Sequence, residues 1–192
     1  KWTLNGTING AWTNLTAITV AEGFITRVKN IAPYNAPGGG TLTFNYVGKP
    51  NNGVKNVTVN AYDSGSLVSG NTVLLANPYP SAIDAARFVR NANNTSKGIG
   101  TLYFWTSNTL YTGGQYAQSD YASWNLTGST TTTSTPLESL RPNGKIASGQ
   151  GFFAQVFADG AITFNNSMRI LEQNTSNTVF YRTAENENSV EN

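Results

Sequence analysis

The chain has 192 residues and a formal net charge of +2, from 12 basic and 10 acidic residues. It contains no cysteine and no histidine, which excludes disulfides, thiolate chemistry, and catalysis or metal binding by imidazole. Charged residues make up only 11% of the chain, against about 25% in typical soluble domains. Threonine, asparagine, serine and glycine carry the polarity instead, a composition that suits an extracellular β protein.

Short alternating segments, rich in β-branched and aromatic residues, recur along the chain between turn residues. They are Leu15–Val20, Gly23–Val28, Thr41–Val47, Val54–Ala61, Thr72–Leu75, Thr101–Trp105, Gly151–Phe157, Ala161–Phe164 and Thr178–Tyr181. Many short strands at this spacing predict an all-β fold, here a two-layer antiparallel β-sandwich that is jelly-roll-like. We expect one module over residues 1–183 and a polar tail or linker over residues 184–192.

One segment between these strands has a helical pattern. Ser81 can cap a helix, and Asp84 follows three residues later, as in a capping box with Asp in place of Glu. We therefore expect one short helix near residues 81–92. The preceding Asn77-Pro78-Tyr79-Pro80 predicts a rigid corner with Tyr79 packed beneath it, and the alternative is an exposed aromatic residue in a binding loop.

Two pairs of segments are similar to each other. Glu22–Val28 aligns with Gln150–Val156, and Gly40–Asn45 aligns with Gly160–Asn165. This pattern predicts an internal repeat of two related β-hairpins, although two amphipathic hairpins can also resemble each other by chance. The low-complexity run Thr127–Thr135 lacks an apolar period and predicts a long loop.

An aromatic-rich stretch supplies the candidate ligand-binding residues. They are Trp105, Tyr111, Tyr116, Asp120, Tyr121 and Trp124. Sugar rings stack on aromatic faces, and neighbouring amides and carboxylates bond sugar hydroxyls, so the stretch predicts a glycan platform on a rigid sandwich. Alternation with Leu102 and Phe104 leaves the second interpretation open, in which some of these aromatics belong to the core.

Other kinds of site are weakly indicated. We expect no enzyme and no cofactor, because the acidic residues fall mostly in turns, at a helix start and in the tail. No motif for a calcium loop is present, but a mixed calcium site that uses Asp63 or Asp120 with backbone carbonyls stays open. Scattered basic residues argue against nucleic acid, and no apolar run is long enough for a membrane span.

Several segments, in the same order and over most of the chain, carry a family likeness. They are Val47–Gly53, Leu75–Ala85, Gly100–Thr106, Asp120–Asn125, Ile146–Phe153 and Ile162–Arg169. They resemble an uncharacterised module found near the C-terminus of large surface proteins of Bacteroidota that use type IX secretion. The first glycine of the family's "GNPYP" is Ala76 here.

The resemblance implies export and display at the cell surface or release, and it implies no activity. We therefore expect a non-catalytic extracellular module of a cell-surface or secreted multidomain protein, acting in adhesion or glycan binding. Its partners would be polysaccharide or neighbouring surface modules. The alternatives are a structural spacer or fibre-forming surface subunit and, less favoured, a polysaccharide-acting enzyme.

Overall fold

The computed structural model describes residues 2–4, 12–14, 17, 19–25, 47–61, 71–106, 120–132 and 141–170. Within these ranges antiparallel strands dominate, and the helices are short. In chain order the elements are β1 (Trp2–Leu4), β2 (Trp12–Asn14), β3 (Lys55–Val59), β4 (Asn71–Ala76), β5 (Ile83–Asp84), α1 (Ala85–Val89), α2 (Ala92–Thr95), β6 (Leu102–Trp105), β7 (Tyr121–Asn125), β8 (Gly128–Thr130), β9 (Lys145–Ile146), β10 (Gly151–Val156), β11 (Gly160–Phe164) and the 3-10 turn η3 (Asn166–Met168).

The first layer is an antiparallel sheet with the strand order β4-β10-β6-β7-β8. Strand β10 lies inside it, paired with β4 from Gly151↔Ala76 to Val156↔Asn71 and with β6 through Phe153↔Tyr103. On the other side of β4, Glu22 forms an antiparallel bridge with Leu75. The sheet therefore joins segments that lie far apart in the sequence.

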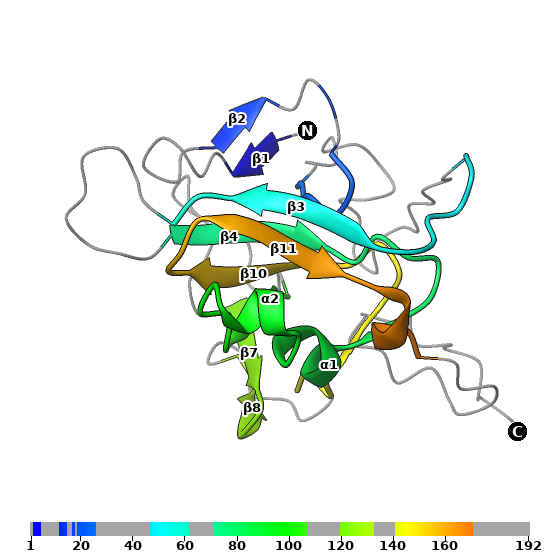
Figure 1. The fold of residues 1–192 in the computed structure, drawn as a ribbon. Helices are drawn as coiled ribbons and strands as arrows, with labels where there is room; N and C mark the ends of the chain where they lie inside the picture. The colour runs from blue at the N-terminus through cyan, green and yellow to red at the C-terminus, as the bar shows by residue number, and fades with distance from the viewer. Residues whose placement is uncertain are drawn as a thin grey trace, which may run out of the picture.

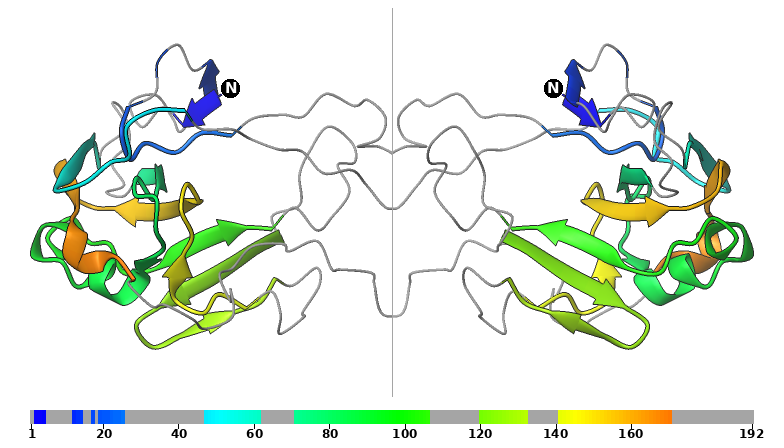
Figure 2. Two further views of the ribbon diagram at one scale, coloured as in Figure 1. Left: turned by 90° about the vertical axis from the view of Figure 1, so that its right-hand side faces the viewer. Right: turned by 90° about the vertical axis from the view of Figure 1, so that its left-hand side faces the viewer.

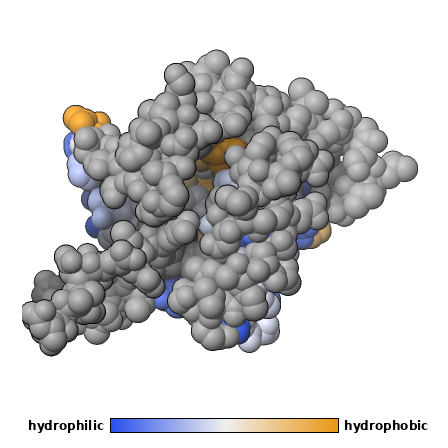
Figure 3. Space-filling view, turned by 180° about the vertical axis from the view of Figure 1, so that it is seen from behind, coloured by the Kyte–Doolittle hydropathy of each residue, from blue (hydrophilic) through white to orange (hydrophobic). Residues whose placement is uncertain are grey.

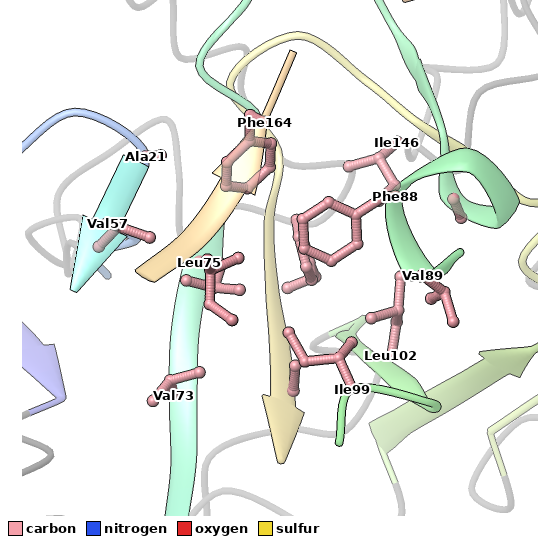
Figure 4. Close-up of a cluster of buried hydrophobic side chains, with 14 of the residues drawn as sticks. Ala21, Val57, Val73, Leu75, Phe88, Val89, Ile99, Leu102, Ile146 and Phe164 are labelled. Carbon is pink, nitrogen blue, oxygen red and sulfur yellow. The ribbon is translucent and has the colours of Figure 1, made fainter. Parts of the chain in front are cut away.

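The second layer is the antiparallel pair β3–β11, which lies in front of β4 and β10 (Figure 1). The core contains Leu75, Phe152 and Phe164, together with Phe88 of α1. The side chains of Leu75, Phe88 and Phe164 lie in one cluster (Figure 4). The Phe88 ring lies 4.8 Å from Phe164 and 5.4 Å, edge-on, from Phe152, centroid to centroid. This arrangement confirms an all-β, sandwich-like fold, while the jelly-roll connection order stays a prediction.

The expected single helix is two short helices. Asp84 caps α1, since its carboxylate accepts hydrogen bonds from Ala86 N at 2.7 Å and Arg87 N at 3.1 Å. Ser81 is not the cap, because Ile83 and Asp84 are extended and pair with β9 through Ile83↔Ile146. Asn91 then interrupts the helical run and caps α2.

Buried amides fix the corner before α1 and the contact of α2 with the second layer. Asn77 Nδ2 donates to Ser81 O, Ile146 O and Ala147 O. Asn94 bonds both Thr163 O and Thr163 N, which ties α2 to β11. Tyr79 is 1% exposed, and its hydroxyl donates to Gly53 O at 2.6 Å, so the corner with Tyr79 packed beneath it is confirmed.

The second repeat unit is not a hairpin. Strand β10 pairs with β4 and β6, whereas β11 pairs with β3, so the turn at residues 157–159 carries the chain from one layer to the other. Asp159 holds this crossing, because its carboxylate accepts from Ala61 N at 2.7 Å. In the first unit Glu22 and Gly23 lie against β4. The second half of that unit, residues 40–45, lies outside the described residues.

The threonine-rich run begins as a strand rather than a loop. Asn125 Oδ1 accepts from Thr127 N and Gly128 N, which closes a tight turn, and β8 returns beside β7. Thr132 is fully buried. Strand β8 contains only one threonine, Thr130, so the turn at Asn125 and the pairing with β7 account for it better than threonine content does. Residues 133–135 and the expected tail, 184–192, lie outside the described ranges.

Candidate functional site

The side views show the strands β6, β7 and β8 of the first layer extending away from β3 and β11 (Figure 2). A pocket of about 530 Å³ borders β7 in this part of the protein. The start of α1, the strand β7, the turn before β9 and the residues after η3 surround it. The side chains that bear on its chemistry are those of Asp84, Arg87, Trp124, Asn143, Lys145 and Arg169. An aromatic residue with a few convergent polar groups in a concave site is the usual composition of a ligand pocket.

Trp124 forms the aromatic part of this pocket. It lies opposite Leu102 on the face of β7 that is turned toward the core, and it is partly buried against the core. Gly144 approaches it closely, since a Cβ built on Gly144 would lie 3.1 Å from Trp124 Nε1 and 3.3 Å from Cε2 and Cζ2. Gly144 also has φ +81°, which favours glycine. The turn is thus shaped to fit the indole.

Two arginines contribute guanidinium groups that the protein already holds in place. Arg87 lies with Nε 3.6 Å from Asp84 Oδ2, and its Nη1 donates to Ser167 O at 2.8 Å. Arg169 Nε donates to Ser81 Oγ at 2.9 Å, and its Cζ lies 5.7 Å from the centre of the Tyr79 ring. With Lys145, the described residues of the lining include three cationic side chains and one carboxylate.

The sheet separates the predicted aromatic residues into two groups. Trp105 and Tyr121 are cross-strand partners on the outer face, away from Trp124. Tyr121 is 38% exposed and meets Phe153 edge-on at 5.6 Å between ring centroids. Burial of the rest of the ring raises the pKa of the Tyr121 hydroxyl above 10.0. Seen from behind, hydrophobic residues are visible near the centre of the molecule (Figure 3).

The remaining predicted residues do not join either group. Asp120 is fully buried, so its carboxylate is not presented at the surface as a glycan contact requires. Its backbone carbonyl accepts from Thr106 N at 3.0 Å and from Thr106 Oγ1 at 2.8 Å, which closes the end of β6 against β7. Tyr111 and Tyr116 lie outside the described residues.

The cationic side of the pocket is what the sequence reasoning missed. Arg87, Lys145 and Arg169 lie far apart along the chain and form no local motif. They converge because β5 pairs with β9, and because Ile83 forms a bridge with Arg169. No shared local signal marks them, because Arg87 lies within a helical segment, whereas Lys145 and Arg169 follow turn residues.

Among the described residues no group of three or more His, Cys, Asp or Glu side chains could hold a metal ion. Neither of the described α-helices has the length or the apolar character needed to cross a lipid bilayer.

The fold and the pocket define an all-β, sandwich-like protein with a basic pocket at one end of its larger sheet. The family described as "Domain of unknown function (DUF8693)" matches residues 1–192, and the chain belongs to this family. Searches of curated proteins and of solved structures find no match.

Proposed function

We propose that this chain is a non-catalytic, extracellular carbohydrate-binding module of a cell-surface or secreted multidomain protein. The observation that carries the proposal is the pocket in which Trp124 lies beside Asn143 and several charged side chains. A sugar ring offers an apolar face that packs on an aromatic ring, and hydroxyl groups that pair with amides and charged groups. The pocket contains both kinds of partner.

The positions of the carboxylates support a non-catalytic role. A glycosidase needs two carboxylates about 5–10 Å apart across the bond that it cleaves. The described carboxylates are Glu22, Asp84, Asp120 and Asp159, and only Asp84 lines the pocket. Asp84 caps α1 and lies beside Arg87, a role that holds its carboxylate in place.

The proposal that the protein is exported does not depend on the pocket. The low content of charged residues and the resemblance to surface modules of Bacteroidota both favour an extracellular location.

The alternative role, a fibre-forming subunit, is less well supported. Strand β8 lies at the edge of the sheet, and Arg141 Nη1 donates to Ser129 O there. An edge carbonyl that is already bonded is less available for pairing with a second chain.

The experiment measures binding of the purified protein to a panel of neutral and acidic polysaccharides by affinity electrophoresis and calorimetry. Trp124→Ala should abolish binding, and Trp124→Phe, which keeps a ring against the core, should weaken it. Trp105→Ala removes an aromatic side chain from the opposite face and should leave binding unchanged.

Absence of binding to every polysaccharide would contradict the proposal. If Trp105→Ala loses binding and the Trp124 variants keep it, the binding site lies on the outer face of the sheet. A monomer–oligomer equilibrium in sedimentation, without any glycan binding, would favour the structural role instead.

A further inference from the structure

We propose that the pocket selects an anionic sugar residue, whose carboxylate or sulfate group is bound by Arg87, Lys145 and Arg169. This inference rests on the proposed function, because it names the class of ligand for the same pocket. It goes further in assigning three residues outside the aromatic stretch as the specificity-determining groups.

The first argument is the balance of charge. Among the described lining residues the pocket has three cations and one carboxylate, that of Asp84, in a chain whose whole net charge is only +2. An excess of positive charge in a concave site raises the local concentration of anions and strengthens their binding. A neutral sugar does not need this excess of positive charge, whereas the negative charge of an acidic sugar would neutralise it.

The second argument is the donors that remain for a ligand. A guanidinium has five N–H donors. The contacts of Arg87 and Arg169 with the protein use Nε and Nη1 of each group. Among the described residues the second terminal nitrogen of each has no hydrogen bond, which leaves donors suited to a carboxylate or sulfate oxygen.

The third argument is that the two arginines are positioned before any ligand binds. Arg169 is fixed between Ser81 Oγ and the face of the Tyr79 ring, and Tyr79 itself is buried. Arg87 is fixed by the backbone carbonyl of Ser167. Side chains that are already ordered lose less conformational entropy on binding, so their hydrogen bonds contribute more to affinity.

Asp84 is expected to oppose the binding of an anion. Its carboxylate lies 3.6 Å from Arg87 Nε and would compete with an anionic ligand for that guanidinium. Asparagine is as good a helix cap as aspartate, so Asp84→Asn keeps α1 and removes the competing charge. The substitution should therefore tighten binding of an anion, the opposite of what loss of a ligand contact would do.

The experiment uses two matched pairs of polymers: polygalacturonate against its fully methyl-esterified form, and dextran sulfate against dextran. Within each pair the sugar backbone is the same, and one polymer carries negative charges that the other lacks. We expect at least one charged polymer to bind about tenfold more tightly than its neutral counterpart, in proportion to one charge-assisted hydrogen bond. Which charged polymer binds identifies the anion as carboxylate or sulfate.

The variants are Arg87→Gln and Lys145→Gln, with Arg90→Gln as the matched control. Arg90 is exposed at the end of α1 and does not line the pocket, yet its loss changes the net charge by the same amount. We expect each pocket variant to weaken binding of the charged polymer about tenfold, Asp84→Asn to strengthen it, and Arg90→Gln to have no effect. Thermal denaturation of each variant verifies that it is folded.

Equal binding of charged and neutral polymers, with no effect of Arg87→Gln or Lys145→Gln, would overturn the inference and leave the proposed function standing. An equal loss in Arg90→Gln would also overturn it, because it would show unspecific attraction of a polyanion. If no polymer of either kind binds, the proposed function fails, and the inference fails with it.

Discussion

Strand β7 carries two aromatic residues with opposite surroundings. Tyr121 lies on the outer face of the sheet beside Phe153, and Trp124, three residues later, lies on the inner face beside Gly144. The alternation of a strand makes this difference inevitable, because residues an odd number apart point to opposite faces. The comparison teaches that aromatic residues close together in a sequence do not form one surface when they lie an odd number of residues apart in one strand.

The largest expected effect tests whether the side chains on the inner face of the first sheet contribute most to the stability of the fold. Phe152 is fully buried and contacts Phe88 and Phe104. Phe152→Ala should lower the free energy of unfolding by about 3–5 kcal/mol, because it removes buried area and leaves a cavity. Urea denaturation followed by circular dichroism measures the loss.

The matched substitution on the outer face is Tyr121→Ala. Its ring is 38% exposed and has one ring contact with Phe153. We expect a loss of about 1 kcal/mol, since an edge-to-face pair contributes about that amount. Equal losses in the two variants would show that the two faces do not differ in the way the structure describes.

The next effect concerns the turn that meets Trp124. Gly144 and Gly149 have φ values of +81° and +69°, but only Gly144 has atoms close to the position of a Cβ. Alanine at either site should cost about 1–2 kcal/mol for the left-handed conformation. Gly144→Ala should in addition displace the Trp124 indole and shift tryptophan fluorescence. Identical unfolding midpoints and spectra for the two variants would contradict the close approach.

A smaller effect is the change in stability with pH that comes from Tyr79. Burial raises the pKa of Tyr79, and nearby Arg169 opposes the rise only in part. A phenol whose pKa is higher in the folded state contributes stability that is complete below its unfolded pKa of about 10 and is lost as the pH rises through the folded pKa. Ionisation would also remove the hydrogen bond from Tyr79 to Gly53 O.

Tyr79→Phe should therefore cost about 1 kcal/mol at pH 7, the net contribution of one hydrogen bond, and should reduce the fall in stability between pH 9 and pH 11. Urea midpoints measured across that range determine both quantities. A wild-type midpoint that is constant up to pH 11 would contradict the assignment.

The smallest effect is expected for Tyr121→Phe. No hydrogen bond of the Tyr121 hydroxyl is described, and the ring contact with Phe153 survives the change. The free energy of unfolding at pH 7 should stay within about 0.5 kcal/mol of the wild type. A larger loss would mean that the outer face contributes more than the edge-on ring contact.

Much of the fold follows from short-range patterns in the sequence. The strands around Val73, Phe152 and Ile162 were predicted from alternation, and the corner at Tyr79 from its two prolines. Such features depend on neighbours in the chain. The break between α1 and α2 was not predicted, because it depends on Asn91 acting as a cap inside a run that otherwise reads as helical.

The pairing of strands and the composition of the pocket could not be predicted in this way. Nothing in the local pattern of residues 150–165 distinguishes a hairpin from a crossing between layers, since both need two strands and a turn. The pocket depends on the pairing of β5 with β9, which brings Lys145 toward Asp84. Of the predicted ligand residues that the structure describes, Trp124 alone lines the pocket.

The position of β10 and β11 late in the chain has a consequence for folding during synthesis. Strand β4 ends at Ala76 and β6 at Trp105, yet the strand that joins them begins at Gly151, and β3 gains its partner only at Gly160. Loops of this length must close before such contacts form, which slows folding. Neither layer can be completed until β10 and β11 have left the ribosome, so the core between the two layers cannot form while the residues before Gly151 are being synthesised.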